Sequence, residues 1–251
     1  LKGYPISAFL FWQIDQERKA DWEIYKFIEN FKFGDTHNEL VEPDGRDVVL
    51  VLDGQQRLTS LIIGLRGTFS LRSKYGRRQN PDSWSRQRLY IDLLKDPTTA
   101  SDDGDHEEIG VTYGLRFFEN EPRNDANHLW MKVGRILDCT SDDAFDRLDE
   151  EMLARLPAET PRSMRRIAVK NLERLHRTIW KDLVITYYTE KDQSYDRVLD
   201  IFIRANDGGT KLSKSDLLLS MITSKWEGMS ARQEIYDFVE HLNPVSYTHL
   251  T

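Results

Sequence analysis

The chain has 251 residues, of which 39% are hydrophobic and 31% charged, and its formal net charge is −7 at pH 7. This balance is typical of a globular protein with a sizeable core, and no apolar run reaches the roughly 18–20 residues that a membrane helix needs. The negative charge excludes a protein that coats nucleic acid by bulk attraction, although a local basic face could still contact phosphates.

The N-terminal part of the chain predicts a small sheet. Residues 5–14 are dense in apolar and aromatic side chains and indicate a buried strand or a short helix. Residues 21–33 carry a stripe of aromatic and aliphatic side chains at helical spacing. Residues 48–52 are a β-branched run typical of a fully buried strand. The helical spacing of the leucines and isoleucine in 58–65 then predicts strand, tight turn and helix.

The second half of the chain is predicted to be mainly helical. Apolar side chains alternate along residues 89–93, which predicts a strand, and residues 183–189 indicate another strand. A long helix is predicted after Thr160, which would cap it, and Pro161, which would open it. Three further helices are predicted, at about 145–152, 195–206 and 214–226. We therefore expect an α+β fold, with a small mixed sheet followed by a mainly helical half.

The turn from Asp53 to Arg57 is the first candidate site. A strand that runs directly into a helix leaves free N–H groups and a positive dipole end, which suit phosphate. Gly54 allows close approach of a ligand or a positive φ, and Asp53 could cap the helix or hold Mg²⁺. Arg57 opposes the helix dipole unless an anion binds there.

The two glutamines of this turn add amide groups. Gln55 and Gln56 could bind a base or sugar, or orient a water molecule for attack on phosphate. The structural alternative is an aspartate N-cap followed by polar residues on a solvent-exposed face. The sequence alone leaves both interpretations open.

Residues 202–216 form the second candidate site. Gly208 and Gly209 are predicted to end one helix, and a Ser-x-x-Asp capping box is predicted to start the next. Arg204 and Asn206 lie near the end of the first helix, where each also has a purely structural role as a dipole partner or a cap.

A continuous basic stripe follows Pro161. Its members recur at helical spacing and are Arg162, Arg166, Lys170, Arg174, Arg177 and Lys181. The opposite face carries apolar residues that we expect in the core. A solvated surface is the default interpretation of such a stripe, and contact with DNA phosphates or a partner domain is the alternative.

Several site classes are excluded by their spacing. The chain has no Gly-x4-Gly-Lys-Ser/Thr motif, and its six histidines lack the spacing of a metal hydrolase or nuclease. Cys139 is the single cysteine, which excludes an internal disulfide and a cysteine-cluster metal site. A lone thiol also fits a reducing cytoplasm, where we expect the protein to reside.

The stretch VLDGQQRLTSL, followed later by FIRANDGGTKLSKSDLL, resembles the N-terminal domain of GmrSD-type, nucleotide-dependent DNA restriction enzymes. The resemblance implies a ParB/sulfiredoxin-like fold, with a nucleotide-binding part at 1–138 and a helical part at 139–245. Residues 246–251 continue no pattern, and we expect them to be a non-native tail. The resemblance also implies that the chain is part of a longer protein, acting with a C-terminal or separate nuclease domain and, through the whole protein, on DNA in phage defence.

The resemblance further implies a nucleoside triphosphate with Mg²⁺ as the ligand. Catalysis is assigned to Asp53, Gln55, Gln56 and Arg57. Nucleotide binding is assigned to these four residues and to Gly54, Thr59, Arg204, Asn206, Gly208, Gly209, Thr210 and Lys211. Two alternatives stay open: a nucleotide-switched binding module without turnover, as in ParB-like clamps, and a structural domain whose motif only caps a helix.

Overall fold

The computed structural model describes residues 8–17, 24–32, 39–42, 47–73, 80–97 and 113–207. By its contacts the chain divides into two compact units, Leu1–Gln193 and Ser194–Thr251. The described strands and helices are mixed along the chain, which confirms the predicted α+β class. The predicted domain boundaries near residues 138 and 245 stay predictions.

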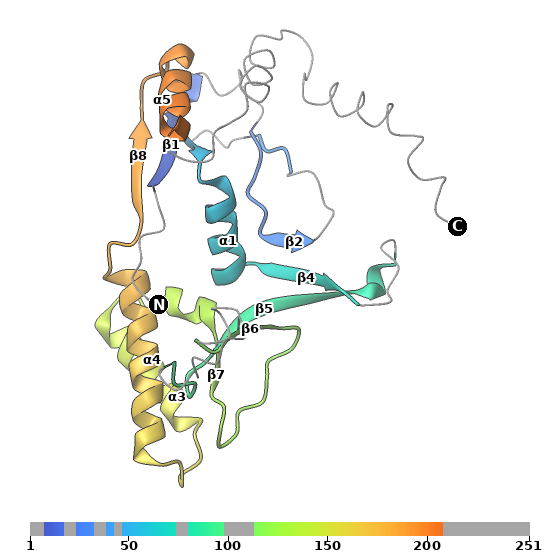
Figure 1. Ribbon diagram of the computed structural model, residues 1–251, viewed down its shortest axis with the longest axis vertical. Coiled ribbons are helices and arrows are strands. Elements are labelled where there is room, and N and C mark those ends of the chain that lie inside the picture. Colours follow the sequence, from blue (N-terminus) through green and yellow to red (C-terminus); the bar gives the residue numbers. More distant parts are fainter. Residues whose placement is uncertain are drawn as a thin grey trace. The chain divides into compact units, whose positions relative to one another are not determined.

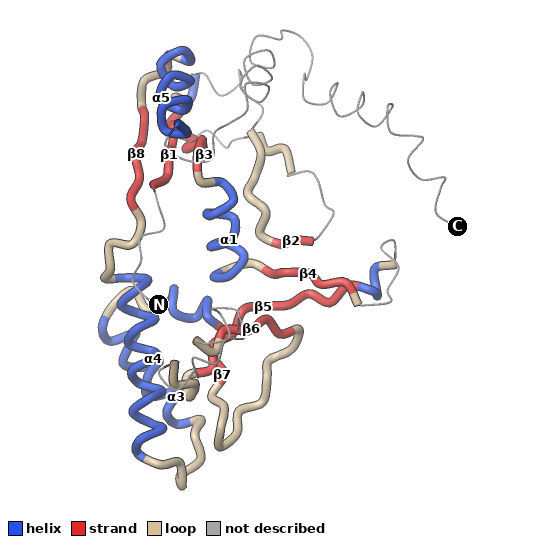
Figure 2. Tube along the Cα trace, viewed as in Figure 1, coloured by secondary structure: helices blue, strands red, loops and turns tan. Residues whose placement is uncertain are grey.

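A three-stranded sheet has β1 (Ala8–Ile14) at its centre, between β3 (Val48–Asp53) and β8 (Thr186–Glu190). The pairing is antiparallel with β3 and parallel with β8, and Figure 2 shows the three strands side by side. The aromatic and aliphatic side chains of β1 are mostly buried. The apolar segment predicted as a strand or a short helix is therefore a central strand.

The prediction that residues 48–52 form a strand is confirmed, but the prediction that this strand is fully buried is wrong. Val49 is 54% exposed, and the other residues of β3 are partly buried. The reason is position, because β3 is an outer strand of the described sheet whereas β1 takes the centre.

The second sheet has the order β2 (Asn30–Lys32), β4 (Thr68–Arg72), β5 (Trp84–Asp92) and β6 (Leu115–Phe118). β2 is parallel to β4, the other pairs are antiparallel, and β7 (Trp130–Lys132) also pairs with β5. A short 3-10 turn, η2 (Pro81–Ser83), precedes β5. Helix α1 (Gln55–Leu65) connects β3 of the first sheet to β4 of the second (Figure 1).

The helix predicted at residues 21–33 is wrong in the part of this segment that the structure describes. Residues 30–32 form β2, and Tyr25 makes an isolated antiparallel bridge with Leu40. Phe31 stacks on Phe69 of β4, with ring centroids 5.5 Å apart and planes 1° from parallel. Pairing with a strand distant in sequence has therefore overridden the local helical pattern.

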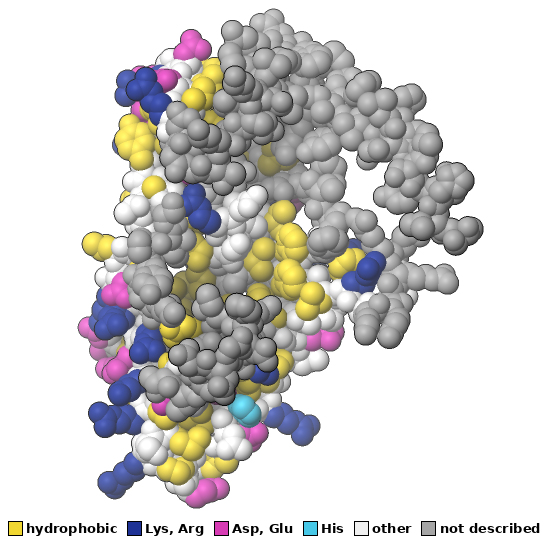
Figure 3. All heavy atoms as spheres, in the orientation of Figure 1, with side chains coloured by type: hydrophobic (Ala, Val, Ile, Leu, Met, Phe, Trp, Pro, Cys, Tyr) yellow, Lys and Arg dark blue, Asp and Glu magenta, His cyan; other side chains and the backbone are white. Residues whose placement is uncertain are grey.

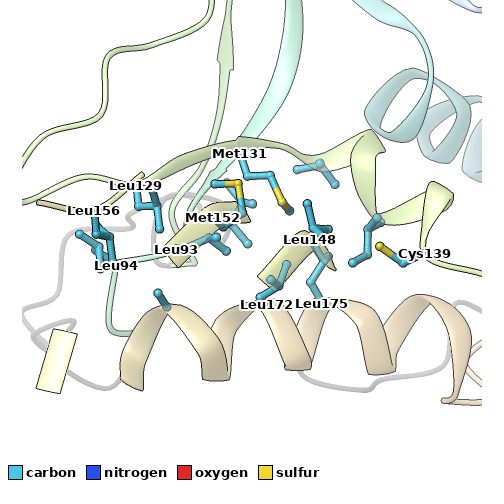
Figure 4. Close-up of a cluster of buried hydrophobic side chains, with 14 residues drawn as sticks. Leu93, Leu94, Leu129, Met131, Cys139, Leu148, Met152, Leu156, Leu172 and Leu175 are labelled. Carbon is cyan, nitrogen blue, oxygen red and sulfur yellow. The ribbon is translucent and has the colours of Figure 1, made fainter. Parts of the chain in front are cut away.

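The main apolar core joins the second sheet to the helices η3 (Val133–Asp138), α3 (Asp142–Ala154) and α4 (Arg162–Trp180). Figure 4 shows Leu172 and Leu175 of α4 directed at Leu148 of α3, with Met131 of β7 above them. The backbone N–H of Ala144 donates to the hydroxyl of Ser141, which caps α3.

The predicted cap of α4 is wrong. The N-cap residue is Pro161, and α4 begins at Arg162 without a side-chain cap. Thr160 therefore lies one position too early to reach the first-turn N–H groups. Its buried hydroxyl oxygen has no hydrogen-bond partner in the described part of the chain.

The second unit contributes helix α5 (Tyr195–Asp207), close to the predicted helix at 195–206. The helix predicted at 214–226 lies outside the described residues. Within the described ranges, no helix has both the length and the apolar character required to cross a lipid bilayer.

Candidate functional site

Gly54 makes the turn between β3 and α1 possible. It is the N-cap residue of α1 and has a left-handed backbone conformation, with φ +88° and ψ 12°. A Cβ atom at this position would lie 2.5 Å from Cδ1 of Phe9 on β1. The position therefore requires glycine for two reasons, its backbone angle and its close approach to an aromatic ring.

Asp53 and Arg57 form an ion pair across this turn. The Nη2 atom of Arg57 donates to Oδ2 of Asp53 over 3.0 Å, and each side chain is about one-third exposed, at 32% and 34%. The guanidinium also lies over the ring of Phe9, 5.1 Å from its centroid. Both contacts hold the charge at the start of α1.

The ion pair changes two sequence-based interpretations. Asp53 does not cap α1, because Gly54 is the N-cap residue and no side chain supplies a cap. The positive charge of Arg57 in the first helical turn is offset by Asp53, so it does not by itself demand an external anion. Its partial exposure nevertheless leaves it accessible to one.

The first turn of α1 presents polar groups and no acidic side chain. Gln55 is exposed, and its amide nitrogen donates to the carbonyl of Val51 over 2.9 Å. Gln56 is also exposed, and its backbone carbonyl accepts a hydrogen bond from the hydroxyl of Ser60. The positive end of the helix dipole is therefore not neutralised by an acidic residue of that turn.

The turn offers one carboxylate for a divalent cation. Among the described residues there is no group of three His, Cys, Asp or Glu side chains that could hold a metal ion. Mg²⁺ in nucleotide sites is commonly held by one or two carboxylates together with phosphate oxygens and water. Asp53 fits that donor set as a single protein ligand, whereas a metal cage made of protein side chains alone does not.

An open groove of about 650 Å³ begins at the same end of α1. One wall is the helix face that carries Gln55, Gln56 and Thr59, and the opposite wall includes Phe31, Phe69 and Phe117. The sequence did not predict this aromatic wall. Its three phenylalanines belong to different strands, and Phe31 had been assigned to a helix.

The second predicted constellation is described only at its beginning. Arg204 lies in the last turn of α5, where its Nε atom lies 3.0 Å from Oδ2 of Asp200. Asn206 lies in the same turn, and residues 208–211 (Gly208, Gly209, Thr210 and Lys211) lie outside the described residues. The approach of these residues to a nucleotide stays a prediction.

The predicted basic stripe lies on the outer face of α4. Arg162, Arg166 and Lys170 are exposed and Arg174 is partly buried, while the apolar residues of the opposite face pack in the core. Arg177 lies 3.7 Å from Asp182, and Lys181 lies 3.5 Å from Asp142. Figure 3 shows Lys and Arg side chains along the surface over α4.

The structure also brings together Asp92 and His128, a pair that sequence reasoning missed. Oδ2 of the buried Asp92 lies 2.7 Å from Nδ1 of His128, and Oδ1 accepts the backbone N–H groups of Leu94 and Leu129. These three interactions tie the end of β5 to the segment before β7. No spacing rule connects two residues that meet through strand pairing, so the sequence carried no signal for this pair.

The fold and the turn define an α+β protein with a strand–turn–helix unit, in which a partly exposed arginine lies in a first helical turn that has no acidic residue. The family model described as the GmrSD restriction endonuclease, N-terminal domain, matches residues 1–223. The chain belongs to this family, as its two motifs predicted. A comparison with curated proteins gave no match.

Proposed function

We propose that the turn from Asp53 to Arg57 binds the phosphates of a nucleoside triphosphate with its Mg²⁺. The domain would hydrolyse this nucleotide to control DNA cleavage by a nuclease domain. The observation that carries the proposal is the start of α1, where a left-handed Gly54 opens the helix end and a partly exposed Arg57 is held beside it.

Arg57 has the chemistry to bind phosphate oxygens. A guanidinium has five N–H donors in a fixed fork that matches phosphate, and the carboxylate of Asp53 accepts from Nη2. A triphosphate would compete with Asp53 for this cation and would also accept from the first N–H groups of α1. Asp53, released from the pair, would then face the metal ion.

Gln56 is the better candidate for orienting the attacking water. Its side chain is exposed at the helix start, whereas the amide nitrogen of Gln55 is already bonded to Val51. A bound Mg²⁺ would supply charge neutralisation of the phosphates. The protein side chains would place the reactants.

A nucleotide-switched binding module without turnover is the alternative function. The ion pair between Asp53 and Arg57 favours it, because an arriving phosphate would exchange the partner of Arg57 and could move β3 relative to α1. Such an exchange needs binding energy and no bond cleavage.

Isothermal titration of the full-length protein with the four nucleoside triphosphates and Mg²⁺ tests the binding site. Arg57→Ala should abolish or strongly weaken binding, whereas Arg66→Ala, at the exposed C-terminal end of the same helix, should leave it unchanged. Equal affinity of wild type and Arg57→Ala would refute the site.

Phosphate release separates the two functions. Gln56→Ala should abolish release and spare binding if the domain is a hydrolase. A wild-type protein that binds nucleotide and releases no phosphate, with or without DNA, would support the switch instead.

A further inference from the structure

The groove beside α1 has two walls of different chemistry. The aromatic wall is built from three strands of the second sheet, with Phe31 of β2, Phe69 of β4 and Phe117 of β6. The opposite wall is the polar face of α1 with Gln56, Thr59 and Ser60. Figure 3 shows hydrophobic side chains gathered at the surface over α1, β2 and β4.

The aromatic rings present flat surfaces in series. Phe31 and Phe69 are stacked, and Phe117 is tilted by 44° against Phe69 with a centroid distance of 5.5 Å. Phe117 is 37% exposed, although large apolar side chains are usually buried. This wall therefore offers an aromatic face to a ligand.

The charge of the lining restricts the ligand. Among the described residues that line the groove, none is charged, while hydroxyl and amide groups face the rings. Phosphate groups would find no cation in such a lining. A flat, uncharged group with donors and acceptors on its edge satisfies both walls, because it can stack on one and hydrogen-bond to the other.

The groove continues from the proposed phosphate site. Gln55 and Gln56 belong to the first turn of α1 and also line the groove, which reaches Gly64 in the last turn of that helix. At a rise of 1.5 Å per residue, this stretch is about 13 Å long. The volume lies within the range of about 300–1,000 Å³ that small-ligand sites occupy.

We propose that this groove holds the base and ribose of the nucleotide whose phosphates bind at the turn from Asp53 to Arg57. The inference rests on the proposed function and adds how the nucleoside is recognised. The base stacks on the aromatic wall at Phe117, and the polar face of α1 at Thr59 and Ser60 reads its edge. One nucleotide would then contact both sheets, with its phosphates at the end of β3 and its base on the phenylalanines of the second sheet.

The test compares two probes on the full-length protein with Mg²⁺: each nucleoside triphosphate, and inorganic tripolyphosphate, which has no base. Wild type should bind the preferred nucleotide more tightly than tripolyphosphate. Phe117→Leu should weaken nucleotide binding roughly fivefold or more, as loss of a base–aromatic stack does, and leave tripolyphosphate binding unchanged.

Phe118→Leu is the matched control. Phe118 is the next residue of β6, and its ring packs edge-on against Trp130, 4.8 Å between centroids, outside the groove. This variant should keep both affinities even if its Tm falls.

Thr59→Val is a second probe of the groove. It removes a hydroxyl with little change in shape, and it should alter the preference among the four nucleotides.

Each other outcome overturns the inference. If tripolyphosphate binds as tightly as every nucleotide, the phosphate site stands and the groove does not hold a base. The same holds if a folded Phe117→Leu variant binds nucleotide like wild type and Thr59→Val keeps its preference. Concentration-dependent dimerisation weakened by Phe117→Leu, with nucleotide affinity unchanged, would show a second copy in the groove. If wild type binds neither probe, the proposed function fails as well.

Discussion

Gly54 meets a constraint that no other residue type satisfies at this turn. Any other residue would have to adopt a backbone φ of +88°, and its Cβ atom would meet the ring of Phe9. We expect Gly54→Ala to lower the free energy of unfolding by at least about 1–2 kcal/mol, the cost of a left-handed conformation for a residue with a Cβ atom. Denaturant unfolding of wild type and variant measures the loss.

Gly64→Ala is the matched control on the same helix. Its Cβ atom would meet Leu89 at 3.5 Å, an ordinary contact, and its backbone φ is not positive. Alanine in a helix interior is favoured over glycine by about 1 kcal/mol, so stability should be unchanged or higher. Equal losses at both positions would show that the strained turn does not exist.

Glu151 is predicted to give stability that depends on pH. The side-chain hydrogen bond from Arg135 lowers the pKa of Glu151 from 4.5 to about 2, and Arg155 also donates to this carboxylate. Because the folded-state pKa lies below the unfolded value, the contribution is complete above about pH 4.5 and is lost as the pH falls towards 2. The side chain is 45% exposed, so the contribution is at most about 1 kcal/mol.

Unfolding free energies of wild type and Glu151→Gln, measured from pH 6 downwards, check this expectation. Their difference should shrink as the pH falls below 4.5. Glu159→Gln, at an exposed carboxylate without an ion pair in the described part of the chain, serves as the reference. A difference that stays constant with pH would contradict the role of the Arg135 pair.

Two predictions concern substitutions on opposite faces of helix α4. On its inner side, the amide nitrogen of Asn171 donates to the carbonyls of Leu93 and Lys95, 2.9 and 2.8 Å away, and so fixes the chain after β5. Asn171→Ala should lower the free energy of unfolding by about 1–3 kcal/mol, since two carbonyls lose a donor. Thermal unfolding measures the loss; a change no larger than that of exposed Ser163→Ala would contradict it.

Contact with DNA phosphates is the alternative to a solvated surface for the basic stripe on the outer side of α4. Lys170→Glu with Arg174→Glu should then reduce the magnitude of the slope of log affinity against log salt by roughly two, one for each lost phosphate contact. The full-length protein and a DNA fragment suffice for the measurement. Reversal of two arginines on other elements, Arg116→Glu with Arg147→Glu, controls for net charge. An unchanged slope in the α4 variant would reject the contact.

The accuracy of sequence-based prediction differs between elements for a physical reason. The strand, turn and helix around Gly54 were predicted because their signals all lie within the short segment from Val48 to Leu65. β2 was predicted as a helix because its partner, β4, lies far along the chain. The partial exposure of β3 likewise follows from its outer place in the sheet and not from its own residues.

In the candidate site too, features that depend on neighbouring residues were predictable, and features that depend on contacts across the whole molecule were not. Asp53, Gln56 and Arg57 could be selected from the sequence because they share one turn. The pairing of Arg57 with Asp53 and its position over Phe9 required the sheet to be known. The aromatic wall of the groove depends on three strand pairings at once, and periodicity along one segment cannot reveal these.

Ligand binding at this site should raise the stability of the whole protein. A ligand that binds only the folded state stabilises it by about 2.7 kcal/mol when present at 100 times its Kd. Nucleoside triphosphate with Mg²⁺ should therefore raise Tm in wild type and not in Arg57→Ala. Differential scanning fluorimetry gives the comparison, and an equal rise in both proteins would place the ligand elsewhere.

The parallel pairing of β1 with β8 also constrains the order in which the molecule can fold during synthesis. Ala8 pairs with Thr186, so the central strand of the first sheet lacks one neighbour until β8 has left the ribosome. Contacts of such large sequence separation form slowly. Phe9, which supports the arginine of the turn, belongs to that strand, and the site is therefore complete only after the helical core segments α3 and α4 have emerged.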